Sequence, residues 1–263
     1  MLGAIIGDLA GSIYEFDQFK KHKKITVKNI IEENAFFSDD TILTIAIADS
    51  IINNKNYGKT LKEYALQFEN DIPKGIPYFE KMFSSGFLSW AKSNEEGHSQ
   101  GNGAMMRISP VGYLFDNENE VIKNAYLATA PSHNTKEAIE CATIVALIIF
   151  YARKGLSKEE IKTKLNLQIK TPSITEFNYT CPDTIDVCLY SLFNSNSFEE
   201  SIKTAISYGG DTDTNACIVG SMAEAMFGIS DELKQKAIQK LPNDFKKILD
   251  KCYKRVNNLT QQA

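Results

Sequence analysis

Residues 211–227 read DTDTNACIVGSMAEAMF, and residues 38–52 read SDDTILTIAIADSII. Each stretch places two Asp residues and two hydroxyl residues directly ahead of an apolar segment with helical rather than alternating periodicity. Ser, Thr and Asp favour the start of a helix because their oxygens accept hydrogen bonds from free backbone N–H groups. The two stretches therefore predict helices over 42–52 and 216–227, each with an acidic N-terminal end.

The same periodicity continues outward from these two segments, and the strict alternation typical of strands is rare. Further helices are predicted over 61–70, 120–130, 136–153, 158–165, 184–193 and 197–207. Pro242 is expected to split the C-terminal segment into two short helices, because proline lacks the N–H that a helix interior needs. Helix therefore dominates the predicted secondary structure. Since no Pro/Gly/Ser-rich linker divides the chain, we predict a single domain over 1–263.

Composition and charge narrow the classes of function. The chain is 43% hydrophobic and 24% charged, which excludes dominant disorder, and its 33 acidic and 29 basic residues give a net charge of −4, which does not favour a general nucleic-acid surface. The longest nearly apolar run, 141–152, is shorter than the roughly 20 residues that a spanning helix needs. Five cysteines without a C-x-x-C pair are expected to be small buried hydrophobes in a reducing compartment. We therefore expect a cytoplasmic monomer without a membrane partner.

The two acidic helix starts are the strongest candidates for a metal site. Taken singly, each is explained by helix capping. Together, their adjacent carboxylates exceed what capping needs, and like charges repel one another unless a cation neutralises them. Short Asp side chains that meet from two helix ends can surround hard cations with oxygen ligands, so magnesium or manganese fits better than zinc.

Three other features can bind or process a ligand, and each has a structural alternative. The loop SQGNGAMMR at 99–107 can offer backbone N–H groups to a phosphate with the Arg107 guanidinium nearby, or it can be an ordinary turn with Arg107 in an ion pair. His133 precedes a predicted helix, where it can contact a ligand or cap the helix. Glu15 lies among apolar and glycine residues, where desolvation can raise its pKa toward general acid/base work, unless it is exposed.

Five motifs in order along the chain resemble the ADP-ribosylglycohydrolase family. They are GDLAGSIYE at 7–15, SDDT at 38–41, GNGAMMR at 101–107, SH at 132–133 and GGDTDTN at 209–215. The resemblance covers about residues 3–228 and is carried by the order of the motifs rather than by any one of them. Cys217 stands where the family usually has alanine, at an expected helix-packing position.

The resemblance implies an all-α fold around two divalent cations, magnesium or manganese, and assigns residues position by position. The implied metal ligands are Ser38, Asp39, Asp40, Asp211, Asp213 and Thr214. The implied ADP-ribose contacts are Ser99, Gly101, Asn102, Gly103 and His133. Glu15 would be the acid/base carboxylate.

The implied function is metal-dependent hydrolysis of the glycosidic bond between ADP-ribose and an acceptor, which reverses ADP-ribosylation. The expected substrate is an ADP-ribosylated protein or another ADP-ribosylated acceptor, and nucleic acid is a partner only if it is the modified acceptor. The alternatives are a non-catalytic ADP-ribose-binding or structural member of the same fold, and a two-metal phosphoester hydrolase. Phosphoester hydrolases of this kind typically use histidine ligands, and this chain has three histidines in all.

Overall fold

The computed structural model describes residues 1–15, 25–73, 75–76, 79–173 and 177–261, and the regular structure in these residues is helical. Extended pairing in this part of the chain is limited to two isolated bridges, between His98 and His133 and between Gly101 and Thr180. The all-α prediction is confirmed. The helices are α1 (Leu2–Gly11), α3 (Asp39–Ile52), α4 (Tyr57–Phe68), α5 (Ser85–Lys92), α6 (Gly103–Met106), α7 (Ser109–Leu114), α8 (Glu118–His133), α9 (Lys136–Arg153), α10 (Lys158–Lys164), α11 (Cys181–Phe193), α12 (Phe198–Ser207), α13 (Thr212–Phe227), α14 (Asp231–Gln239) and α15 (Asn243–Gln261).

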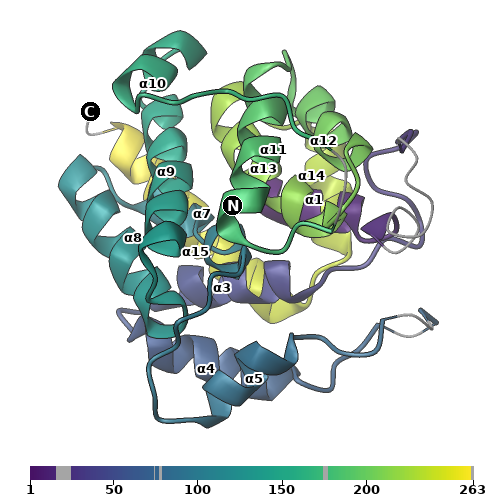
Figure 1. The fold of residues 1–263 in the computed structure, drawn as a ribbon, viewed down its shortest axis with the longest axis vertical. Coiled ribbons are helices and arrows are strands. Elements are labelled where there is room, and N and C mark those ends of the chain that lie inside the picture. Colours follow the sequence, from purple (N-terminus) through teal and green to yellow (C-terminus); the bar gives the residue numbers. More distant parts are fainter. Residues whose placement is uncertain (16–24, 74, 77–78, 174–176, 262–263) are drawn as a thin grey trace.

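Helix α13 lies at the centre of the molecule, packed against α1, α9, α11 and α12 (Figure 1). Its contact with α1 is the most extensive between any two helices, and glycine makes that contact possible. A Cβ on Gly7 would lie 2.0 Å from the Ala216 carbonyl oxygen, and one on Gly11 would lie 2.3 Å from the Thr212 carbonyl oxygen. Because side chains are absent on this face of α1, the two backbones touch, which brings Asp8 beside the start of α13.

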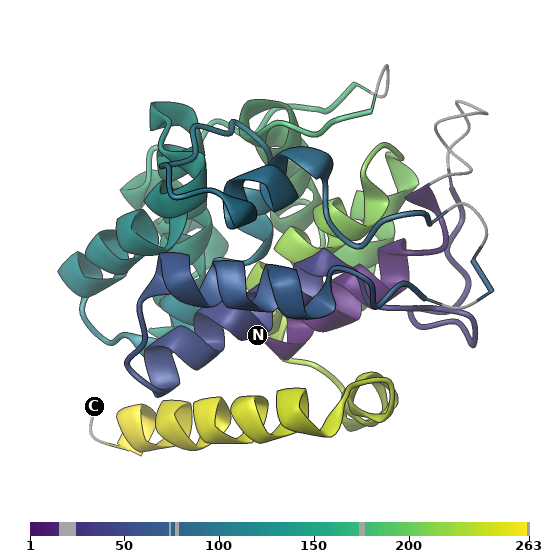
Figure 2. The same ribbon diagram turned by 90° about the horizontal axis from the view of Figure 1, so that it is seen from below.

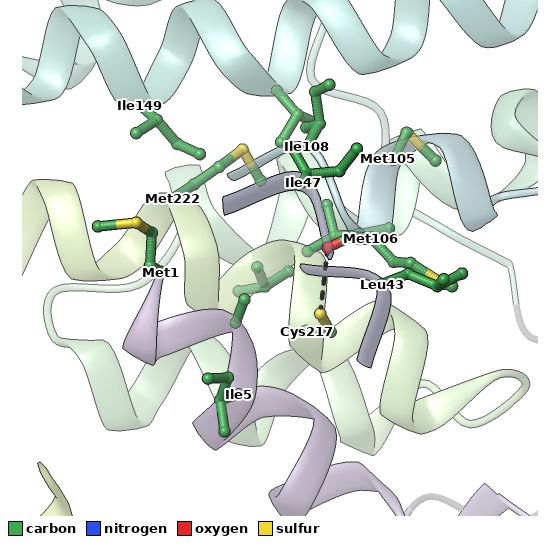
Figure 3. Close-up of a cluster of buried hydrophobic side chains, with 14 of the residues drawn as sticks. Met1, Ile5, Leu43, Ile47, Met105, Met106, Ile108, Ile149, Cys217 and Met222 are labelled. Atoms are coloured by element: carbon green, nitrogen blue, oxygen red, sulfur yellow. Dashed lines mark hydrogen bonds between the residues drawn. The ribbon is translucent and has the colours of Figure 1, made fainter. Parts of the chain in front are cut away.

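Apolar side chains from distant parts of the chain fill the space around this helix pair. Figure 3 shows Met1, the N-cap of α1, and Ile5 of α1 near Leu43 and Ile47 of α3 and Met222 of α13, and all five are buried. The Cys217 thiol lies in the same cluster and donates a hydrogen bond of 3.4 Å to the Met106 carbonyl oxygen. All five cysteines are buried and free, as the sequence predicts.

The predicted start of α3 is confirmed, and two other predictions need correction. Ser38 is the N-cap of α3, and its side chain accepts a hydrogen bond from the Asp40 N–H. The prediction of two short C-terminal helices is wrong in one respect, because α15 has 19 residues (Figure 2). Its Phe245, Leu249 and Cys252 are buried at helical spacing, and this apolar stripe against the body of the protein supports a long helix.

The helix predicted to end at Ala130 instead passes through Pro131 and ends at His133. The last carbonyl groups of α8 have partners in the loop that follows α5. Gly97 N–H donates to the Pro131 carbonyl oxygen at 2.9 Å, and Ser99 N–H donates to the Ser132 carbonyl oxygen at 3.3 Å. Tertiary hydrogen bonds thus satisfy the end of α8, and they fix His133 beside the 99–107 loop.

The short helices α5, α6 and α7 were not predicted. None of the helices among the described residues is both long and apolar enough to cross a membrane.

Candidate active site

The N-terminal ends of α3 and α13 meet beside α1. The Thr214 hydroxyl lies 3.3 Å from Asp40 Oδ2, which joins segments that are 174 residues apart in the chain. Asp8 of α1 lies between these ends and receives hydrogen bonds from α3. The two acidic stretches that were singled out in the sequence therefore form one site.

Asp8 is a site residue that the sequence analysis did not assign, although it lies in the first motif. Its carboxylate accepts hydrogen bonds from the Ser38 N–H at 2.9 Å, the Ser38 hydroxyl at 2.9 Å, the Thr41 N–H at 3.1 Å and the Thr41 hydroxyl at 2.5 Å. Burial, followed by repulsion from Asp213, raises the pKa of Asp8 to about 7. The available signal was a single carboxylate inside the otherwise apolar segment 2–13, since an unpaired charge in a buried helix is costly.

The carboxylates form two groups that share Asp213. One group contains Asp8, Asp40 and Asp213, and the other contains Glu15, Asp211 and Asp213; within each group the candidate ligand atoms lie within 4.8 Å of one another. Asp40 Oδ1 is buried and has no hydrogen-bond partner among the described residues. Burial and mutual repulsion raise the pKa of Asp40 and of Asp211 well above the usual range.

This arrangement fits divalent cations. Closely spaced buried carboxylate oxygens, one of them without a partner, form the hard donor set that magnesium and manganese prefer. Three other predicted ligands have different places in the structure. Asp39 lines the adjoining cavity but belongs to neither group. The Ser38 hydroxyl lies 2.9 Å from Asp8 Oδ1 and 3.2 Å from Asp40 Oδ2, and the Thr214 hydroxyl donates to Asp40.

Amide side chains hold the α13 end of the site in place. Asn102 donates a hydrogen bond of 2.7 Å from Nδ2 to Asp211 Oδ2. The Asp211 N–H donates to Asn178 Oδ1 at 3.2 Å, and Asn178 Nδ2 donates to Asn215 Oδ1 at 2.7 Å. Asn102 thus links the glycine-rich loop directly to a carboxylate of the candidate metal site.

A cavity of about 850 Å³ opens from the carboxylates toward the loop at 99–103. Its walls include all of the residues that were predicted to contact ADP-ribose, together with Glu15. These predicted contacts are Ser99, Gly101, Asn102, Gly103 and His133. Phe79, Phe83, Phe87, Phe177 and Tyr179 add aromatic surface to the wall. A larger groove of about 1030 Å³, lined by Lys62 and Tyr126 among others, contains none of the clustered carboxylates.

The loop that holds Gly101 and Gly103 is anchored on both sides. Asn102 N–H donates to the Tyr179 carbonyl oxygen at 2.9 Å, and Cys181 N–H donates to the Gln100 carbonyl oxygen at 2.8 Å. A Cβ on Gly103 would lie 3.5 Å from Nε2 of His133, and one on Gly101 would lie 3.6 Å from the same atom. The loop and the histidine ring therefore face one another across a narrow gap.

Glu15 lies half-buried on the cavity wall, just beyond α1. Burial raises its pKa to about 10, with further increases from Asp213, Asp211, Asp39 and Asp8. In the absence of cations this carboxyl group holds its proton at neutral pH. The structure thus places Glu15 in a desolvated, acidic environment, which is the setting that general acid/base work needs.

Arg107 and His133 are both buried beside the loop. Burial and the neighbouring Arg107 cation hold the pKa of His133 well below its usual range, so the ring is neutral. Burial lowers the pKa of Arg107 to about 10, which leaves the guanidinium charged at neutral pH. Arg107 forms no ion pair with the described residues, so the ion-pair alternative for this residue finds no partner there.

Comparisons with known proteins identify the family and the fold. A family model described as ADP-ribosylglycohydrolase matches residues 1–262. The ADP-ribosylarginine hydrolase Tri1 of Pseudomonas putida is 23% identical over 265 residues, which cover 88% of this chain and 70% of that protein. ADP-ribosylhydrolase ARH3 of Mus musculus is 20% identical over 312 residues, which cover 87% of this chain and 83% of that protein. A solved structure of an ADP-ribosylglycohydrolase-related protein complex matches with a TM-score of 0.70 and 19% identity, over 97% of each chain, and shows the shared fold.

Proposed function

The chain belongs to the ADP-ribosylglycohydrolase family, and from this premise we propose that it hydrolyses the glycosidic bond between ADP-ribose and an acceptor in a metal-dependent reaction. The observation that carries the proposal is the pair of carboxylate groups that share Asp213 and open, with Glu15, into a cavity walled by the 99–103 loop. Two relatives with hydrolase names support the class of reaction.

We propose that the site holds two divalent cations, magnesium or manganese. Asp8, Asp40 and Asp213 are the proposed ligands on one side, and Asp211 and Asp213 are the proposed ligands on the other side, with the Glu15 carboxyl group next to them. Ser38, Asp39 and Thr214 remain proposed ligands because their oxygens lie at the same two helix starts. When bound, the cations supply Lewis-acid chemistry and neutralise the clustered negative charge.

Side chains and backbone groups of the protein would transfer protons and bind the diphosphate. Hydrolysis adds water to the anomeric carbon as the bond to the acceptor breaks, so a proton must leave the water and another must reach the leaving group. Glu15 is the proposed proton carrier, through its side-chain carboxyl oxygens. In the 99–103 loop the N–H groups of Ser99, Gly101 and Asn102 already donate within the protein, so those of Gln100 and Gly103 are the proposed donors to the diphosphate. Donors of this kind would let a protein with a net charge of −4 bind an anionic substrate.

For the acceptor we propose a chemical class rather than a single molecule. ADP-ribosylated protein is the first candidate, because the name of one relative specifies ADP-ribosylarginine. The other candidate acceptors are ADP-ribosylated serine, nucleic acid and small molecules. A cytoplasmic monomer is part of the same proposal.

Release of free ADP-ribose from a panel of ADP-ribosylated acceptors tests the function. The panel is incubated with the full chain in magnesium, in manganese and in a chelator, and free ADP-ribose is measured by chromatography. We expect release from at least one acceptor with metal and none with chelator. Calorimetric binding of ADP-ribose without release from any acceptor would indicate the non-catalytic alternative, and release that persists in chelator would contradict the role of the metal.

A further inference from the structure

Three buried polar side chains in contact with one another line the ligand cavity. Arg107 is fully buried, and Ser132 and His133 are 3% and 4% exposed. Arg107 Nη2 lies 2.6 Å from the Ser132 hydroxyl oxygen and 3.5 Å from His133 Nδ1. The Ser132 hydroxyl oxygen lies 2.7 Å from His133 Nδ1.

The direction of these hydrogen bonds follows from the chemistry of the donors. A guanidinium has N–H donors and no acceptor, so Arg107 must donate and the Ser132 oxygen must accept. The Ser132 hydroxyl proton then points away from Arg107. Among the described residues its acceptor is His133 Nδ1, which places a lone pair, and not a proton, on that nitrogen.

The other tautomer conflicts with two features of the cluster. A proton on Nδ1 would face the Arg107 cation at 3.5 Å, and it would leave the Ser132 hydroxyl proton without an acceptor in the described part of the chain. A buried donor without an acceptor is costly, and so is an N–H group whose positive end faces a cation. Since a neutral imidazole carries one proton, that proton belongs on Nε2.

The Nε2 atom faces the cavity. It lies 3.6 Å from the position of a Cβ on Gly101 and 3.5 Å from that of a Cβ on Gly103, so the absence of side chains on both glycines leaves the space in front of it open. We propose that Arg107 and Ser132 are positioning residues that hold His133 in the neutral Nε2–H tautomer, as a permanent hydrogen-bond donor to an oxygen of bound ADP-ribose. The identity of this ligand rests on the proposed function, whereas the tautomer rests on the three side chains alone.

A donor of this kind behaves differently from an ordinary histidine. A ring with a pKa near 6.5 would gain a proton as the pH falls from about 8 to 5, and would then bind an anion more tightly. The His133 ring is expected to keep one proton, on Nε2, over the whole of that range. Its contribution to ADP-ribose binding is therefore independent of pH.

Two-dimensional ¹⁵N–¹H NMR of the imidazole rings tests the tautomer in the full chain. The chain contains only His22, His98 and His133, so one substitution for each histidine assigns the signals. We expect His133 to show a protonated Nε2 and an unprotonated Nδ1 from about pH 5 to 8. A His133 ring that is protonated on Nδ1, or that titrates near pH 6.5, would overturn the proposal.

Variants test the positioning role. In Ser132→Ala the hydroxyl link is lost, and we expect a mixture of His133 tautomers and about a fivefold weaker ADP-ribose affinity, the equivalent of one net hydrogen bond. Ser132→Thr retains the hydroxyl and should restore both measurements. Ser191→Ala is the matched control, because Ser191 is a buried serine on α11 whose hydroxyl has no partner among the described residues. An unchanged tautomer in Ser132→Ala would contradict the role of Ser132.

Arg107→Met removes the buried charge and should also give a mixture of His133 tautomers. If that variant does not fold, the Ser132 variants still test the proposal. Titration with ADP-ribose completes the experiment. A shift of the His133 Nε2–H signal on binding supports the contact. Binding without any change at His133 would show that the contact is wrong, whereas the release assay on ADP-ribosylated acceptors tests the proposed function separately.

Discussion

Glu15 is the residue whose substitution is expected to reduce turnover without reducing the affinity for ADP-ribose. Glu15→Gln keeps the size and hydrogen-bonding capacity of the side chain but removes the proton that it can exchange. We expect kcat to fall by roughly 10²–10⁴ while the affinity for ADP-ribose is largely retained. Release assays and calorimetry on one preparation provide both values. Unchanged turnover would remove Glu15 from the mechanism, and a joint loss of turnover and of metal binding would make it a cation ligand instead.

Asp213 is the residue that the two carboxylate groups share, so its charge serves both candidate cation positions. Asp213→Asn should abolish cation binding and activity and leave the helix content unchanged, because the substitution removes a charge and no core contact. Calorimetry with manganese, activity and circular dichroism measure the three effects. Asp183→Asn is a matched control, since Asp183 is an exposed residue in the first turn of α11. Normal turnover of Asp213→Asn would show that this carboxylate is not an essential ligand.

At the scale of elements, the contact between α1 and α13 depends on glycine. In Gly7→Ala the new methyl group would lie 2.0 Å from the Ala216 carbonyl oxygen, and backbone cannot move aside as a flexible side chain can. We expect the free energy of unfolding to fall by about 3 kcal/mol or more, at the upper end of overpacking effects. Urea denaturation measures the change.

Gly86→Ala is the control for this prediction. Gly86 lies in α5, and a Cβ there would meet no atom within 4 Å. The same substitution should therefore stabilise the protein by about 0.5–1 kcal/mol through helix propensity. Equal effects at both positions would contradict the close approach of α1 and α13.

The loop at 99–103 is the element that we expect to bind ADP-ribose rather than the acceptor. Asn102→Trp would fill the space beside the loop and remove the hydrogen bond to Asp211. Affinity for free ADP-ribose should weaken, and kcat/KM should fall in parallel for every acceptor tested. Asn119→Trp, at an exposed position in α8, is the control. A loss confined to one acceptor would instead indicate that the loop contacts the leaving group.

At the scale of the whole molecule, the buried carboxylates link stability to pH and to metal. The pKa of Asp8 is raised to about 7 and that of Glu15 to about 10, whereas unfolded Asp and Glu titrate near about 4. Between these values the folded chain binds more protons than the unfolded chain, so these groups lower the stability as the pH rises. Cations that replace the protons should remove this loss.

The stabilisation of the protein by magnesium or manganese should therefore grow between about pH 5 and 8. Saturating metal is expected to raise the melting temperature by roughly 5–10 °C at the upper end of this range, and by less at the lower end. Comparing the melting temperatures with metal and with chelator at each pH cancels the contribution of groups that titrate in the same way in both forms. A metal effect that does not depend on pH would contradict the link to the carboxylates.

Helical periodicity and capping residues predicted that helix dominates the fold and where α3 starts, and the two acidic stretches predicted the helix ends that meet at the site. These features are local, because a helix cap or an apolar stripe depends on residues that are close together in the sequence. The predicted contacts with ADP-ribose came from the family resemblance, and tertiary packing gathers them on one cavity wall.

Only the tertiary structure decided the place of Asp8, the length of α15 and the passage of α8 through Pro131. Asp8 belongs to the site because glycine lets α1 touch α13, and that contact joins residues about 200 positions apart. The hydrogen bonds that end α8 come from the loop after α5, and they also set the distance between His133 and the glycines. Such contacts depend on which surfaces meet in the folded protein. The residue pattern of one segment does not identify the segment against which it packs.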